Sequence, residues 1–208
     1  MTTVYAMSCR PLLQPALLAQ AQQRLSAECC TRIARARTPL AKAQHAGAWL
    51  LVTHLLGVNG QPPAITYTAH GKPLLADGRA GFNLSHSGEW VFCAVSDGAV
   101  GLDAQQTRPL SPGTLRRCFS AQEQTWAAAH RDGAIRLWTR KEAYGKYTGE
   151  GLRMPIAAVR VPLSPEEMES HPLFWQEFRQ GDICITLCAE KPAAAYTVLP
   201  SLPALDRQ

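Results

Sequence analysis

The stretch Trp138–Leu152 reads WTRKEAYGKYTGEGL and is the most informative part of this chain. We predict a long helix from Ile135 to about Tyr147, ended by Gly149. On such a helix Glu142 and Lys146 lie one turn apart on the same face. Taken alone, this spacing is more typical of an exposed ion pair worth about 0.3–0.5 kcal/mol than of a functional site. The chemistry of the segment therefore depends on what surrounds it.

Helices and strands are predicted on both sides of this segment. The expected elements are a strand at 4–7, helical sequence at 15–37 with a restart at 26–28, a helix at 39–56, and strands at 65–68, 90–96 and 183–188. Asp97-Gly98 is a strong hairpin signal, so the strand from Val100 is expected to return beside the preceding one. Ser120 and Glu123 fit a helix start with a capping box. The fold class is therefore predicted to be mixed α and β, with a seam near residues 97–100.

Composition and charge limit the class of protein. A hydrophobic share of 46% and a charged share of 18% describe an ordinary globular chain. The net charge of +5 suits an anionic partner, although it also fits simple solubility. Seven cysteines without a C-x-x-C pair argue against a zinc site and fit a reducing compartment. Because the N-terminus lacks a signal peptide pattern and the apolar run at 46–58 is too short to span a bilayer, we expect a soluble, cytoplasmic protein.

Several common chemistries do not fit the residues present. We read Ser85-His86-Ser87 as a loop, and a base directly beside its nucleophile rarely has the geometry of a hydrolase triad. There is also no P-loop and no GxGxxG, and basic residues do not interleave with aromatics as a nucleic-acid surface requires. Asp103 ends a predicted strand, and together with Glu142 and nearby lysines it could build a Mg²⁺–diphosphate site. Sequence spacing cannot show that Asp103 and Glu142 meet.

Five motifs in order give these residues a context. They are GKP at 71–73, FNLSHSG at 82–88, VGLD at 100–103, FSAQE at 119–123 and WTRKEAYGKYTGEGL at 138–152. Each motif alone is weakly specific, but their order, spacing and content together resemble the 4′-phosphopantetheinyl transferase superfamily, in particular its surfactin-synthetase type. The resemblance covers roughly residues 70–152, with weaker similarity in the helices before them.

The resemblance implies a pseudo-dimeric, two-lobed α+β monomer with coenzyme A bound between two pseudo-symmetric halves, residues 1–98 and 99–208. It assigns the metal ligands to Asp103 and Glu142, with Gln105 as a further ligand, directly or through water. It places Lys141 and Lys146 on the phosphates of coenzyme A. The remaining cofactor contacts, at the nucleotide end, are Lys72, Ser85 and His86.

The same resemblance implies the reaction. The enzyme would act as a holo-acyl-carrier-protein synthase in fatty acid or polyketide biosynthesis, moving 4′-phosphopantetheine from coenzyme A to a serine of an apo acyl or peptidyl carrier protein. The reaction would require Mg²⁺ and release adenosine 3′,5′-bisphosphate. Glu142 would take the serine proton or orient a water that does, and Lys146 would offset the charge of the leaving nucleotide. Neither nucleic acid nor a membrane is expected as a partner.

Two positions depart from the family pattern. Members of this type usually carry Asp-x-Glu at the metal, whereas this chain has Asp103-Ala104-Gln105, with one negative charge fewer. Ala48 aligns with an arginine that contacts a phosphate of coenzyme A, and Arg37 or Lys42 could substitute for it. The alternative hypothesis is therefore a catalytically impaired module of the same fold that only binds carrier proteins.

Overall fold

The structure is a computed structural model that describes residues 1–151 and 155–200. Leu152, the last residue of the long motif, and the tail from residue 201 lie outside the described residues. With 41% of the chain helical and 28% in strands, the fold is α+β, as predicted.

The elements occur in two groups along the chain. The first contains β1 (Thr2–Ser8), the 3-10 helix η1 (Arg10–Leu13), α1 (Pro15–Gln22), α2 (Ala27–Arg35), α3 (Pro39–Leu56), β2 (Ile65–Tyr67), β3 (Pro73–Leu75), β4 (Gly81–Ser87) and β5 (Trp90–Ser96). The second contains β6 (Val100–Gln106), α4 (Pro112–Cys118), α5 (Ala121–Ala129), α6 (Gly133–Thr148), the 3-10 helix η3 (Ile156–Ala158), α7 (Pro165–Ser170), β7 (Phe174–Gln180), β8 (Ile183–Ala189) and β9 (Ala193–Val198).

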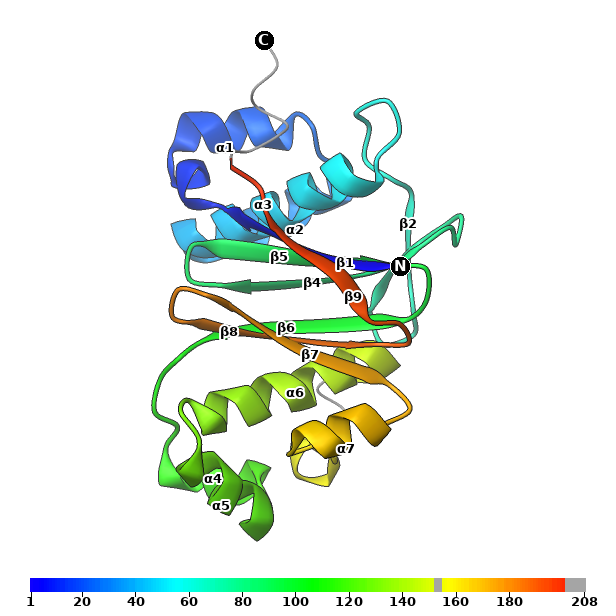
Figure 1. Cartoon of the computed structure of the whole chain (residues 1–208). Coiled ribbons are helices and arrows are strands. Elements are labelled where there is room, and N and C mark those ends of the chain that lie inside the picture. The colour runs from blue at the N-terminus through cyan, green and yellow to red at the C-terminus, as the bar shows by residue number, and fades with distance from the viewer. Residues whose placement is uncertain (152–154, 201–208) are drawn as a thin grey trace.

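Two sheets lie in the middle of the molecule, with helices on their outer sides (Figure 1). The first sheet has the strand order β4-β5-β1-β9, and the second has the order β6-β8-β7. Strand β9 follows the second sheet in sequence but pairs in parallel with β1 of the first. Helices α1–α3 cover the first sheet, and α4–α7 lie on the side of the second. The short hairpin of β2 and β3 stands apart from both sheets.

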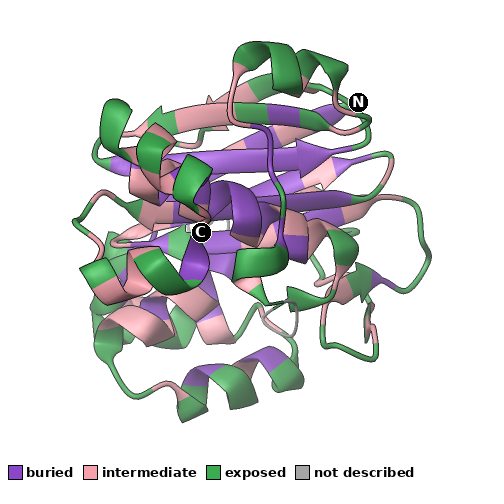
Figure 2. Ribbon diagram, turned by 90° about the horizontal axis from the view of Figure 1, so that it is seen from below, coloured by how far each residue is buried: buried purple, intermediate pink, exposed green. Residues whose placement is uncertain are grey.

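Apolar side chains hold these layers together. Between the sheets, Val4 and Phe92 from the first sheet belong to the same buried cluster as Leu102 and Ile185 from the second. Figure 2 shows that the buried residues concentrate on the central strands and that the exposed ones lie mainly on the outer helices. Among the described residues, no helix combines the length and apolar character needed to cross a bilayer.

Helix α6 packs unusually close to β6. A Cβ atom added at Gly101 would lie 2.0 Å from the carbonyl oxygen of Ala143 and 2.4 Å from the backbone nitrogen of Tyr147. Only glycine fits there, because both neighbouring atoms belong to the helix backbone. This close approach fixes the C-terminal half of α6, which carries Glu142 and Lys146, against the strand that carries Asp103.

The two sheets meet along a seam between β4 and β6. Asn83, Ser85 and Ser87 accept hydrogen bonds through their side chains from the backbone nitrogens of residues 102, 104 and 106, at 2.9, 3.0 and 2.8 Å. Both series of residue numbers rise together, so the two strands run side by side in the same direction. Three side chains thus replace the backbone hydrogen bonds that join neighbouring strands within a sheet. We call this set of contacts the β4–β6 seam.

Several local predictions are confirmed. The helix at 39–56 matches α3, the long helix matches α6 and ends at Gly149 with a φ of +81°, and the Ser120–Glu123 capping box is present. The helix restart at 26–28 is also confirmed, because the Ser26 side chain caps α2.

Three predictions are wrong. The strand from Val100 does not return as a hairpin, because β6 pairs with β8 and the turn at Asp97 leads into the other sheet. Ser85-His86-Ser87 is the end of strand β4 and not a loop. The segment after residue 155 contains a helix, α7, capped by Ser164, where only strands and loops were expected.

Candidate active site

The β4–β6 seam brings three predicted site residues into contact. The Lys146 Nζ atom on α6 donates to Asp103 Oδ1 at 2.8 Å and to Ser85 Oγ at 3.2 Å. The Ser85 hydroxyl donates to the same carboxylate oxygen at 3.2 Å. Asp103 and Ser85 are 3% and 5% exposed, whereas Lys146 is half-buried. One carboxylate oxygen is therefore held by groups from two other elements, which are separated from it by 18 and 43 residues in the chain.

Glu142 interacts with the charges of Asp103 and Lys146 in this cluster. It lies one turn before Lys146 on α6 and is half-buried. Burial raises the pKa of Glu142, and the negative charge of Asp103 raises that pKa further, while Lys146 lowers it. The two carboxylates are therefore near enough to repel each other. Lys146 forms its ion pair across the seam with Asp103, so the pair within the helix that spacing alone favoured is not the one that forms.

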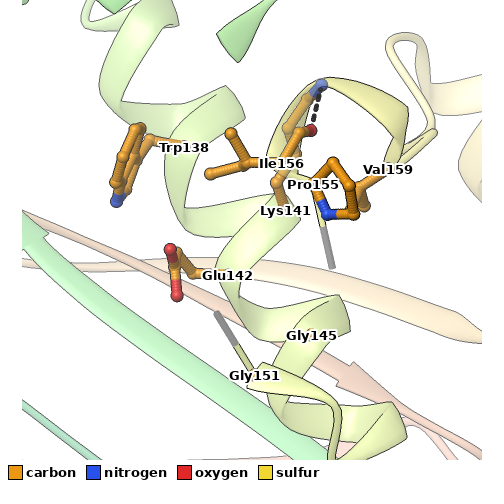
Figure 3. A pocket seen from close by; sticks show the side chains of 8 residues that line it. All are labelled: Trp138, Lys141, Glu142, Gly145, Gly151, Pro155, Ile156 and Val159. Atoms are coloured by element: carbon orange, nitrogen blue, oxygen red, sulfur yellow. Dashed lines mark hydrogen bonds between the residues drawn. The ribbon is translucent and has the colours of Figure 1, made fainter. Parts of the chain in front are cut away.

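Two neighbouring cavities border the cluster. One, of about 200 Å³, is lined by Glu142 and Trp138 of α6 and by Pro155, Ile156 and Val159. Figure 3 shows the Glu142 carboxylate extending from α6 on the same side of that helix as the Trp138 ring. The other cavity, of about 230 Å³, lies between the residue 70–73 turn, β4 and the end of α6, and Lys146 lines it. Gly145 and Gly151 line both cavities, so the two meet at α6.

Lys72 is positioned differently from the prediction. Its ammonium donates to the backbone carbonyls of Tyr147, at 2.9 Å, and Val100, at 3.1 Å. Its aliphatic stem lies over Gly149, whose added Cβ would be 3.4 Å from Lys72 Cδ. Burial lowers the pKa of Lys72. The side chain thus ties the 70–73 turn to the end of α6, and it lines the second cavity with its ammonium bonded to two backbone carbonyls.

The Lys141 ammonium is also bonded to acceptors within the protein. Its ammonium donates to the carbonyls of Cys118 and Ile156, both at 3.1 Å, and lies 2.8 Å from Glu123 Oε1. The side chains of Lys141 and Glu123 are 0% and 4% exposed. All three ammonium hydrogens have protein acceptors and the side chain is fully buried, unlike that of Lys146, so the geometry does not support the direct phosphate contact expected of Lys141. It supports a structural role that fastens α6 to α5 and to the residues around Ile156.

His86 lies on the opposite face of β4 from Ser85, because side chains alternate along a strand. It is exposed. Crowding by surrounding protein atoms lowers the pKa of His86, and the charge of Lys146 lowers it further. Ala48, where an arginine was expected, is 5% exposed and belongs to the core around α3.

The residues around Asp103 offer hard oxygen ligands. No group of three or more His, Cys, Asp or Glu side chains gathers into a possible metal site within residues 1–151 and 155–200. The set here is two carboxylates and the Gln105 amide, whose nitrogen donates to Asp103 Oδ2 at 3.3 Å. Rotation of that amide would present its oxygen instead. Mg²⁺ takes one or two carboxylates and fills its other positions with phosphate and water, and it would relieve the repulsion between Asp103 and Glu142. The donor set therefore fits Mg²⁺.

Sequence reasoning missed two contributors to this site. Asn83 joins Ser85 and Ser87 in the seam, and small polar residues at every second position of a strand were the signal for it. Glu123 was recognised only as part of a capping box. Its ion pair with Lys141 bridges 18 residues, and no local pattern indicates it.

Comparisons with known proteins found a matching family model and several similar proteins. Residues 99–195, which include Asp103, Glu142 and Lys146, match the family model of the 4′-phosphopantetheinyl transferase superfamily. The chain is 37% identical over 100 residues to the 4′-phosphopantetheinyl transferase Sfp of Bacillus subtilis (strain 168), covering 45% of each protein.

Two further relatives match longer parts of the chain. It is 32% identical over 150 residues to HetI of Nostoc sp. (strain PCC 7120 / SAG 25.82 / UTEX 2576), covering 64% of this chain and 63% of HetI. It is 38% identical over 111 residues to AcpT of Escherichia coli (strain K12), covering 49% of this chain and 57% of AcpT. Both are 4′-phosphopantetheinyl transferases. The matches thus span about half to two thirds of these relatives. The family match, the relatives and the ordered motifs support the assignment of the chain to the 4′-phosphopantetheinyl transferase superfamily, of the surfactin-synthetase type.

Proposed function

We propose that this protein transfers the 4′-phosphopantetheine group of coenzyme A to a serine of an apo acyl or peptidyl carrier protein. The observation that carries the proposal is the buried cluster of Asp103, Ser85 and Lys146 with Glu142 beside it, bordered by two cavities. The relatives Sfp, HetI and AcpT are named for this transfer, which supports the same activity here.

The residues of the cluster have distinct roles in this proposal. Glu142 accepts the proton of the carrier serine, directly or through a water. The serine oxygen then bonds to phosphorus while the bond from phosphorus to the departing 3′,5′-ADP oxygen breaks. Lys146, which lines the second cavity, offsets the charge of the departing nucleotide. Ser85 keeps Lys146 and Asp103 in register, since its hydroxyl touches both.

Asp103, Glu142 and Gln105 would hold Mg²⁺ in this proposal. When bound, the ion would neutralise the diphosphate and polarise the phosphorus under attack. Because Gln105 replaces the glutamate that the family usually carries, the site has one carboxylate fewer, and we expect it to bind Mg²⁺ more weakly. The neutral side chain at position 105 also favours the second candidate function, a carrier-binding module of low activity.

The net charge and the free cysteines support the proposed partner and compartment. Carrier proteins are commonly acidic near the modified serine, and a chain of net charge +5 is complementary to such a partner. All seven cysteines are free, as in a reducing compartment. We infer a monomeric cytoplasmic enzyme that needs neither nucleic acid nor a membrane.

The direct test is intact-protein mass spectrometry. Apo acyl and peptidyl carrier proteins are incubated separately with the protein, coenzyme A and Mg²⁺, with EDTA as the control. A mass gain of one phosphopantetheine that disappears with EDTA is the expected result. No gain on any carrier, with coenzyme A still bound, would instead favour the binding module.

A further inference from the structure

The Lys146 ammonium is held between strands β4 and β6, which run side by side (Figure 1). Its acceptors come from two consecutive residues on each strand. On β4 they are the backbone carbonyl of Leu84, at 3.5 Å, and Ser85 Oγ, at 3.2 Å. On β6 they are the carbonyl of Leu102, at 2.9 Å, and Asp103 Oδ1, at 2.8 Å. The position of this ammonium therefore depends on the spacing and the register of the two strands.

Side chains of β4 set that spacing and register. Asn83 Oδ1 accepts a hydrogen bond from the backbone nitrogen of Leu102 at 2.9 Å. Ser85 Oγ accepts the next one from the backbone nitrogen of Ala104 at 3.0 Å. The Lys146 ammonium lies between these two hydrogen bonds, because it contacts the Leu102 carbonyl, which follows the first of them and precedes the second along β6.

Asn83 influences Lys146 through the backbone of β6. The Ser85 hydroxyl contacts the ammonium itself, whereas Asn83 is joined to it through Leu102, whose nitrogen bonds to Asn83 and whose carbonyl bonds to Lys146. Asn83 is 5% exposed and Leu102 is fully buried, so water has little access to replace the lost acceptor. Because an unsatisfied buried N–H is costly, removal of the Asn83 amide should displace β6 relative to β4.

We propose that Asn83 is a positioning residue for the transfer reaction and holds β6 in the register at which Leu102 and Asp103 receive the Lys146 ammonium. This inference rests on the proposed function. There, Lys146 offsets charge that develops as the nucleotide departs, so a displaced ammonium should slow the reaction more than it weakens the binding of coenzyme A. Asn83 also lines the cavity beside Lys146, and a direct contact with the substrate would have the opposite effect, on binding.

The seam supplies matched variants for the test. Asn83→Ala removes the acceptor, whereas Asn83→Ser restores an oxygen, because Ser85 and Ser87 reach the facing N–H groups with the same hydroxyl. The two variants lose nearly the same side-chain volume and differ in that hydroxyl. Ser87→Ala is the control, since it removes a seam bond of 2.8 Å to the backbone nitrogen of Gln106, which lies beyond Asp103 along β6.

Three measurements are made on each variant: the rate of carrier modification by mass spectrometry, calorimetric titration with coenzyme A, and amide hydrogen exchange by NMR. Asn83→Ala should lower kcat about tenfold or more and leave the Kd of coenzyme A unchanged. Exchange at the Leu102 amide should become about tenfold faster, the factor expected for the loss of one hydrogen bond. Asn83→Ser should recover most of both losses, and Ser87→Ala should keep the wild-type kcat.

Several outcomes would overturn this role of Asn83 and leave the proposed transferase intact. They are unchanged turnover in Asn83→Ala, equal loss of turnover in Asn83→Ala and Ser87→Ala, no recovery in Asn83→Ser, or a loss confined to coenzyme A binding. If Asn83→Ala does not fold, Asn83→Ser decides, because near wild-type turnover supports positioning and weakened coenzyme A binding indicates a substrate contact. A wild-type protein that modifies no carrier would overturn both proposals.

Discussion

The buried pair of Lys141 and Glu123 allows a quantitative prediction. In a Lys141→Met variant, the Glu123 carboxylate stays buried without its counter-ion, and the carbonyls of Cys118 and Ile156 lose a donor. Removing one partner of a buried ion pair costs about 3–5 kcal/mol. The hydrogen bond of 2.7 Å from the Ser120 backbone nitrogen to Glu123 remains and compensates only partly. We expect a loss of about 3–5 kcal/mol, a large part of the roughly 5–15 kcal/mol that stabilises a typical domain.

Urea unfolding followed by circular dichroism measures this loss. Arg10→Met is the control, because the Arg10–Glu89 pair is 3.8 Å long and its side chains are 76% and 43% exposed. It should cost about 0.5 kcal/mol or less. A double variant, Lys141→Met with Glu123→Gln, should recover part of the loss, since no unpaired charge remains buried. If Lys141→Met were as stable as the control but bound coenzyme A more weakly, the reasoning would be refuted and the direct phosphate contact restored.

Three further predictions address the site and its support. Glu142→Gln should lower turnover at least about 100-fold while coenzyme A still binds, because the variant cannot accept the serine proton; unchanged turnover would contradict this role. Gln105→Glu should lower the Mg²⁺ concentration needed for half-maximal activity, because it adds a negative charge; equal Mg²⁺ titrations would exclude Gln105 from the metal site. Gly101→Ala should cost about 3 kcal/mol of unfolding free energy through its clash with the α6 backbone, whereas Gly113→Ala, with its nearest neighbour at 3.8 Å, should change stability by less than about 1 kcal/mol.

The most successful predictions concern structure that neighbouring residues determine. Helix α3 begins at the Thr38 cap and Pro39 and ends before Gly57, and α6 ends at Gly149. A capping side chain or a glycine with positive φ acts within about one turn, so a short window of sequence contains the whole cause. The ordered motifs likewise indicated the family without knowledge of any contact.

The incorrect predictions share a different cause. Asp97-Gly98 has the local chemistry of a hairpin, but burial of Leu102 and Ile185 between the sheets is compatible with β6 pairing with β8. Residues 85–87 resembled a loop because they are polar. Their side chains accept hydrogen bonds from strand β6, and a short window of sequence around Ser85 does not contain that strand.

Neighbouring residues were sufficient to predict helices α3 and α6 with their ends and to indicate the family, because caps, periodicity and motif order are properties of adjacent residues. The folded structure was needed to see that Lys146 reaches Asp103 and Ser85, whereas Lys141 is enclosed with Glu123 and Lys72 holds the end of α6. The same residue type is thus paired with a carboxylate beside a cavity at one position and enclosed by protein acceptors at another. Its role depends on which acceptors and how much water surround each ammonium, and packing of distant segments sets both.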